Sequence, residues 1–216
     1  MMLKLSLALA TAILVVLSGN LSGCKGYDRV ESRRGSDTLS RANHPRTYYV
    51  SPQGKDSNPG TKARPWATPG YGSRKLKPGD TLVIRGGRYI LSKYDDDILI
   101  PPSGTSNAFV TIRGEKGDRP VLAGRKNLLA AIDLSGKNYV RIENIEITSD
   151  KGAPFRDAIQ ATGNPVNHLV LKDLYIHHVD EFGVNIGDVS DLKIRKSKIT
   201  HAGLGSVGGP EGKKGG

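Results

Sequence analysis

The sequence has a single cysteine, no helical periodicity after its first residues, and too few acidic side chains to balance its basic ones. Because Cys24 is the only cysteine among 216 residues, an intramolecular disulfide is excluded. No segment after the N-terminal region repeats apolar residues at a convincing helical spacing. A helical protein is therefore excluded as well, and we predict an all-β class.

Acidic residues are outnumbered: 21 Asp and Glu face 32 Lys and Arg, which gives a net charge of +11. Such a surface favours an acidic polymer or an anionic membrane as partner. The charge is equally consistent with basic side chains that only keep strands and turns soluble. No nucleic-acid recognition motif accompanies it, so we expect no nucleic acid as partner.

The N-terminus has the parts of an export signal. Lys4 precedes an apolar run over residues 5–17, which is too short to span a bilayer, and Leu21-Ser22-Gly23-Cys24 follows. This ending resembles the lipobox of bacterial lipoproteins. We therefore predict a signal peptide over 1–23, lipidation at Cys24 and a disordered tether over 24–46. The alternative is an ordinary signal peptide with an incidental cysteine. Lys25 stands where Asp would retain a lipoprotein at the inner membrane, which by family analogy implies an exported protein anchored to the cell envelope, at the outer membrane if the cell is Gram-negative.

The second half of the chain contains an unequal repeat of short strands. Residues 140–147 recur as 169–176 and again as 192–199, at offsets of 29 and 23 residues. Each copy reads as two period-2 strands that meet at a polar bend, and weaker copies begin at Leu82 and Val110. A repeat of this length, built from short strands, predicts a β-solenoid over 47–209. Residues 210–216 are too rich in glycine to pack as a coil, and we expect a flexible tail or a truncation point.

The repeat also predicts what each residue does in its coil. Alternate residues point inward and should stack in apolar columns, of which Ile147, Ile176 and Ile199 form one. Asn144 and Asp173 fall at the same bend, where a left-handed backbone is needed, and their side chains can hydrogen-bond along the axis. A third strand per coil is expected at 157–160, 183–186 and 205–208.

Three motifs in the first half resemble the opening of a known family. They are Tyr49-Val50-Ser51-Pro52-x-Gly54-x-Asp56-x-Asn58-Pro59-Gly60-Thr61, Pro65-Trp66-Ala67-Thr68, and Lys77-Pro78-Gly79-Asp80-Thr81 with Arg85-Gly86-Gly87-x-Tyr89. The sequence is similar to exported right-handed parallel β-helix proteins, among them pectate lyase family 9 and chondroitinase-B-like polysaccharide lyases. The resemblance implies a single-stranded right-handed parallel β-helix. It departs from the family at the short helix that should follow Thr68, because Pro69, Gly70 and Gly72 make a helix costly there, and we expect an irregular cap.

The resemblance also implies a chemistry. Polysaccharide lyases of this kind abstract the proton next to a uronate carboxylate, which requires a base and a cation that neutralises the carboxylate. The candidate bases are Lys172, Lys193 and Arg156. Calcium accepts several carboxylate oxygens in loose geometry, and its candidate ligands are Asp157, Asp180, Glu181 and Asp188. The alternative is that these acids are solvated turn residues.

His178 and His201 each follow an apolar column by two residues and should stack on adjacent coils. Together with Tyr175 they are candidates for contact with a sugar, although histidines stacked only for packing fit the same pattern. We therefore expect a monomeric, carbohydrate-active protein that binds an acidic polysaccharide, with calcium-assisted β-elimination as its chemistry. The alternative is a non-catalytic envelope lipoprotein that binds glycan or is structural, or a truncated lyase.

Overall fold

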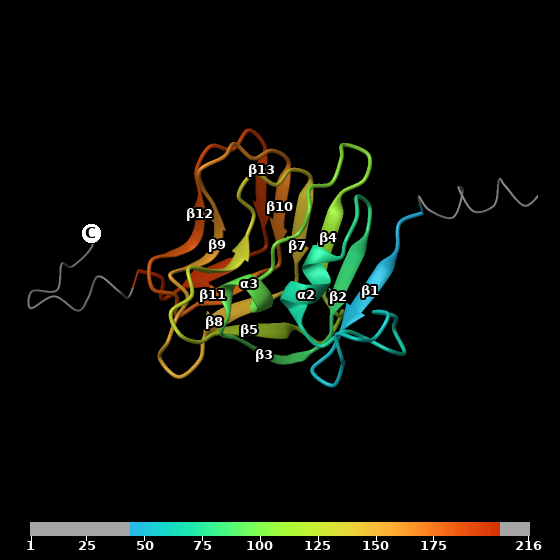
Figure 1. Ribbon diagram of the computed structural model, residues 1–216. Coiled ribbons are helices and arrows are strands. Elements are labelled where there is room, and N and C mark those ends of the chain that lie inside the picture. The colour runs from blue at the N-terminus through green and yellow to red at the C-terminus, as the bar shows by residue number, and fades with distance from the viewer. Residues whose placement is uncertain (1–43, 204–216) are drawn as a thin grey trace, which may run out of the picture.

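Three parallel sheets wind around one core (Figure 1). The computed structural model describes residues 44–203. Sheet A has the order β1-β2-β4-β7-β10-β13, sheet B the order β14-β11-β8-β5-β3, and sheet C the order β12-β9-β6. The elements are β1 (Thr47–Val50), α2 (Pro69–Arg74), β2 (Thr81–Ile84), β3 (Gly87–Leu91), α3 (Tyr94–Asp97), β4 (Val110–Gly114), β5 (Pro120–Gly124), β6 (Ala130–Asp133), β7 (Val140–Glu143), β8 (Glu146–Ser149), β9 (Asp157–Ala161), β10 (Leu169–Lys172), β11 (Tyr175–His177), β12 (Phe182–Ile186), β13 (Leu192–Arg195) and β14 (Lys198–Thr200).

The sequence repeat is one turn of this solenoid. Leu169 on β10 pairs in parallel with Val140 on β7 and with Leu192 on β13, so the offsets of 29 and 23 residues each correspond to one coil. Parallel pairing between coils satisfies the backbone groups that a single coil leaves open. The prediction of an all-β parallel solenoid is confirmed, and its first strand begins at Thr47, where the predicted domain begins.

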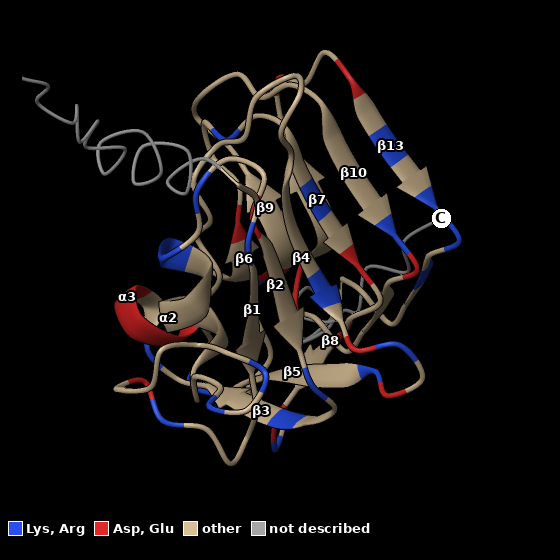
Figure 2. Ribbon diagram, turned by 90° about the vertical axis from the view of Figure 1, so that its right-hand side faces the viewer, with Lys and Arg blue, Asp and Glu red and all other residues tan. Residues whose placement is uncertain are grey.

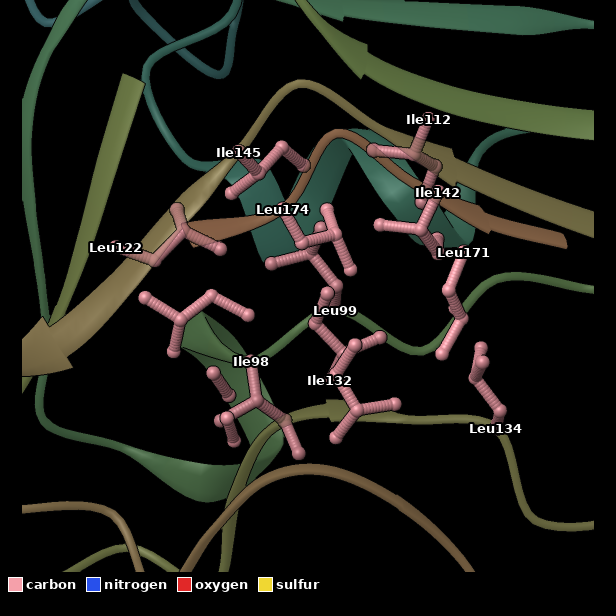
Figure 3. Close-up of a cluster of buried hydrophobic side chains, with 14 of the residues drawn as sticks. Ile98, Leu99, Ile112, Leu122, Ile132, Leu134, Ile142, Ile145, Leu171 and Leu174 are labelled. Carbon is pink, nitrogen blue, oxygen red and sulfur yellow. The ribbon is translucent and has the colours of Figure 1, made fainter. Parts of the chain in front are cut away.

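The core contains the predicted apolar columns of the inner coils. Ile112, Ile142 and Leu171 lie in register on successive strands of sheet A and are fully buried, as Figure 3 shows from within. Each such side chain contributes about 1.5–3 kcal/mol of burial free energy. On the last described coil Ile194 continues the column, but 46% of it is exposed.

The bend between sheets A and B has the predicted left-handed backbone. Asn144, Asp173 and Lys196 have φ angles of 52°, 54° and 51°. Asn144 and Asp173 are joined through a third residue: Arg119 donates from Nε to Asn144 Oδ1 at 3.0 Å and from Nη2 to Asp173 Oδ1 at 2.6 Å. The polar ladder along this bend therefore depends on an arginine from the preceding coil.

The expectation of an irregular cap was wrong. Residues Pro69–Arg74 form the helix α2, which packs on β1 and β2. Pro69 lies in the first turn, where its missing N–H costs nothing. A Cβ on Gly70 would lie 2.3 Å from the carbonyl oxygen of Asp96, so this glycine permits a close approach of α2 to α3. Packing therefore outweighs the poor helix propensity of these residues.

A carboxylate between two arginines ties three strands of sheet B together. Asp150 follows β8 and accepts from Arg125 Nε at 2.7 Å, while Arg88 Nη2 lies 3.5 Å away. The hydrogen bond from Arg125 holds the pKa of Asp150 below its ordinary value of 3.8. A lowered carboxylate pKa contributes stability that is complete above the unfolded-state pKa and is lost as pH falls through the folded-state pKa.

We therefore expect Asp150→Asn to flatten the acid side of the stability profile, measured by urea unfolding between about pH 5 and pH 2. The control is Asp96→Asn, because Asp96 is exposed and pairs only with exposed Lys93 within residues 44–203. An equal loss of stability for both variants across that range would contradict the role given to Asp150.

Several predicted features lie outside the described residues. They are the signal peptide over 1–23, Cys24 with most of the tether over 24–46, the third strand at 205–208 and the tail over 210–216. Within residues 44–203 no helix is long and apolar enough to cross a bilayer.

Candidate functional site

The predicted site residues lie on three different faces of the solenoid. Lys172 and Lys193 are on sheet A, the histidines and Tyr175 are on or beside sheet B, and Arg156 with Asp157 begins a strand of sheet C. The structure therefore does not bring the predicted bases Lys172 and Lys193 next to the predicted calcium ligands.

The outer face of sheet A has two columns of outward side chains, because the alternate residues are buried. The central column is Thr111, Arg141, Val170 and Lys193, and the edge column is Arg113, Glu143, Lys172 and Arg195. Five of these eight side chains are cationic and only Glu143 is acidic. Figure 2 shows Lys and Arg recurring on β4, β7, β10 and β13, on the side that faces the viewer. We call these eight residues the basic face.

From β4 to β10 the cations of the basic face alternate between its columns: Arg113 is in the edge column, Arg141 in the central column and Lys172 again in the edge column. The next strand, β13, carries a cation in both columns, with Lys193 in the central column and Arg195 in the edge column. Glu143 has its carboxylate 3.7 Å from Arg141 and 3.8 Å from Lys172. The cations thus form a zigzag along the solenoid axis, with one step per coil of about 4.8 Å.

A groove of about 560 Å³ follows the edge column. Arg113, Lys116 and Lys172 line it together with Glu143, Asn144 and Asp173, the last two of which are held by Arg119 as described above. Lys172 keeps 46% of its side chain exposed. Its ammonium lies 3.8 Å from the carboxylate of Glu143, and Arg195 is in register with Lys172 on the next coil.

An aromatic column borders the basic face on its other side. Phe109 and Tyr139 meet edge to face at 5.6 Å between centroids, and Tyr139 stacks on His168 at 4.5 Å. The guanidinium of Arg141 lies 5.1 Å from the Phe109 ring centroid, so the aromatic column and Glu143 hold this arginine from two sides. Contacts with the aromatic column and with Glu143 thus hold Arg141 in place in the central column of the basic face.

The predicted stack of His178 on His201 is confirmed, with ring centroids 4.8 Å apart and planes 5° from parallel. His177 joins it through an Nδ1–Nδ1 contact of 2.7 Å to His178, and its Nε2 lies 3.1 Å from a carboxylate oxygen of Glu146. Tyr175 meets His177 at 4.4 Å and lies under the ammonium of Lys198 at 5.5 Å. The ring of Tyr175 is thus partly covered by its neighbours, and sugar contact at these residues stays a prediction.

The predicted calcium ligands are not gathered into one cluster. Asp157 is fully buried and contacts Arg156, Glu181 faces the same arginine, and Asp180 and Asp188 have no hydrogen bond or ion pair at their carboxylates within residues 44–203. Across the described part of the chain, no group of three or more His, Cys, Asp or Glu side chains is placed to hold a metal ion. Because calcium takes six to eight oxygen ligands, these residues do not fit it.

A second polar network lies on sheet C beside these acids. Tyr94 donates its hydroxyl to Asp133 Oδ2 at 2.6 Å, and Gln160 donates its amide to the same oxygen at 3.0 Å. Burial and the bond to Asp133 raise the pKa of Tyr94 to about 12. Burial alone would raise the pKa of Asp133, but the hydrogen bonds from Tyr94 and Ser135 outweigh it and lower that pKa. The hydrogen bonds of this network connect α3 to β6 and β9. The raised pKa of Tyr94 and the lowered pKa of Asp133 keep the proton between them on the Tyr94 hydroxyl.

Sequence reasoning missed Arg113, Arg141 and the aromatic column. Lys172 and Lys193 were singled out one by one, whereas the surface depends on what stands beside them on adjacent coils. Lys172 and Glu143 are one 29-residue repeat apart, as are Val170 and Arg141, so each pair takes the same position in adjacent coils. The alternation was therefore present in the repeat itself.

Comparison with known proteins bears on the whole solenoid. A family model described as the Pel9A-like, right-handed beta helix region matches residues 48–202. The uncharacterized protein YwoF of Bacillus subtilis (strain 168) is 27% identical over 141 residues, which are 61% of this chain and 28% of YwoF.

Two solved structures have similar backbones. The GH136 lacto-N-biosidase from Eubacterium ramulus has a TM-score of 0.57 at 19% identity, over 76% of this chain and 36% of that protein. A rhamnogalacturonan lyase has a TM-score of 0.49 at 18% identity, over 63% of this chain and 37% of the lyase. The chain thus spans 28% to 37% of the length of these relatives.

Proposed function

This chain belongs to the Pel9A-like right-handed β-helix family, and from that premise we propose that it binds an acidic polysaccharide along the basic face of sheet A. The observation that carries the proposal is the zigzag of Arg113, Arg141, Lys172 and Lys193 over four successive coils. A polymer of uronate residues carries one carboxylate per sugar, and a two-fold twisted chain turns successive carboxylates to opposite sides. The step of about 4.8 Å per coil is close to the length of one sugar residue.

The bound chain then lies parallel to the solenoid axis, across the strands. Its carboxylates meet the edge and central columns in turn, and the groove beside Arg113 and Lys172 receives the sugar rings. Each exposed charge pair contributes only about 0.2–1 kcal/mol, so affinity depends on several pairs acting together. The leader and Cys24 add the prediction that the domain is exported and tethered to the cell envelope as a monomer.

Binding to pectate, alginate and chondroitin, measured with the full chain by co-sedimentation, tests the proposal. We expect retention on acidic polymers that decreases as salt rises from about 0.1 M to 1 M, because the Debye length shrinks from about 10 Å to 3 Å. A neutral polymer such as dextran serves as the control. Equal retention on dextran, or none on any acidic polymer, would overturn the proposal.

The ultraviolet absorbance of unsaturated uronate products, followed in the same samples with and without calcium, tests β-elimination as a second function. Lys172 is its candidate base, because it lines the groove. Absorbance that rises for wild type and not for Lys172→Met would assign elimination to this face. Binding without any rise leaves a non-catalytic glycan-binding protein.

A further inference from the structure

Arg156 lies between two of the carboxylates that were expected to hold calcium. It immediately precedes β9 and donates from Nη2 to Asp157 Oδ2 at 3.1 Å, while its Nε lies 3.9 Å from Glu181 Oε2. The main chain fixes this arrangement, because the carbonyl oxygen of Arg156 accepts from the backbone N–H of Glu181 at 2.7 Å. The guanidinium is therefore placed by the register of sheet C as well as by its own side-chain contacts.

Asp157 is the buried member of an ion pair whose arginine keeps 37% of its side chain exposed. Asp157 is fully buried, and Oδ2 also accepts from the Asn185 amide at 3.0 Å, while Arg156 extends to Gln160 Oε1 at 3.4 Å. A buried carboxylate without a counter-charge is strongly destabilising, so Asp157 requires a cation. Only Oδ1 has no partner within residues 44–203, and one oxygen is far from a calcium coordination shell.

We propose that Arg156 is a built-in counter-ion that occupies the place of a bound cation between Asp157 and Glu181, so that this cluster does not bind calcium in the wild-type protein. The two carboxylates and one guanidinium form a closed unit at the start of β9 and β12. Two of the four predicted calcium ligands, Asp157 and Glu181, thus share one role with the predicted base Arg156, which is to offset each other's charge. This inference is independent of polysaccharide binding on sheet A.

Calcium titration of the full chain and of Arg156→Gln, by calorimetry and by thermal unfolding in calcium or in chelator, tests the proposal. We expect no calcium-dependent change for wild type. Arg156→Gln removes the cation and leaves both acids, so it should unfold at lower temperature in chelator and recover in calcium, with calcium binding at least about tenfold tighter than wild type. Asp157→Asn in the Arg156→Gln background should abolish that recovery.

Two matched variants separate the local cation from general charge. Arg156→Lys keeps the positive charge in place and should not bind calcium. Arg64→Gln makes the same change of net charge on an exposed loop and should behave like wild type. Wild-type calcium binding that is lost in Asp157→Asn would overturn the proposal, and the wild-type titration needs no variant to fold. A folded Arg156→Gln protein that gains no calcium affinity would overturn it as well.

Discussion

Replacing Phe155 with alanine is expected to lower the free energy of unfolding by about 3–5 kcal/mol. Phe155 is the largest fully buried side chain within residues 44–203, and it lies between β8 and β9 with its ring against Gly124. Truncating the ring removes its burial and leaves a cavity that the paired strands cannot close. For a domain of this size the loss corresponds to a fall in melting temperature of roughly 6–20 °C, measured by circular dichroism.

Phe182→Ala is the matched control, because Phe182 is the first residue of β12, which pairs with β9 on the next coil, and is 52% exposed. We expect it to cost less than about 1 kcal/mol. Gly124→Ala supplies an independent check: its new methyl group would lie about 3 Å from the Phe155 ring and should destabilise the wild type by about 1–3 kcal/mol. In the Phe155→Ala background the same methyl group has room, so the two costs should not add. Additive costs, or equal effects at Phe155 and Phe182, would contradict this packing.

The fold could be predicted because its information is repeated along the chain. Ile142 and Leu171 predict the same apolar column in consecutive coils, and Asn144 and Asp173 predict the same bend. Each coil therefore supports the prediction made for the next coil. The helix α2 could not be predicted in this way. The helix occurs only once, so no repeat predicts it. Gly70 is needed there because a side chain would clash with the backbone of α3, and helix propensity carries no information on that tertiary contact.

The individual residues of the candidate site could be predicted from the sequence, but which of them lie together could not. Lys172 and Asp157 were both identified from the residue types that elimination needs, yet they lie on different sheets because the bend residues between them turn the chain. Arg156 precedes Asp157 directly in sequence, but sequence spacing alone could not show that its side chain turns back onto this neighbour and onto Glu181. Side-chain direction at a strand start depends on packing around it, which no repeat specifies.

Neutralising two cations of the zigzag is expected to weaken binding of an acidic polysaccharide by roughly 5–30-fold, because each exposed pair contributes up to about 1 kcal/mol. The variant is Arg141→Gln/Lys172→Gln, which removes one cation from each column of the basic face. The measurement is the dissociation constant for a defined uronate oligomer, obtained by biolayer interferometry at low salt. The control Lys62→Gln/Arg64→Gln makes the same change of charge on an exposed loop and should alter binding less than about twofold.

A second variant distinguishes the zigzag from simple positive charge. In Arg141→Val/Val170→Arg the composition and the net charge are unchanged, and the cation stays in the central column but moves one coil along the axis. It then lies two residues before Lys172 on β10 and in register with Lys193 on β13, so the alternation between the columns is lost. If charge alone attracts the polymer, this exchange leaves the affinity unchanged. If carboxylates on alternate sides of the polymer meet cations on alternate columns, one pair is lost and a like-charge contact is gained, so affinity should decrease by about tenfold. An unchanged dissociation constant for the exchange variant, with a weakened one for the neutralised variant, would keep binding on sheet A and overturn the alternating register.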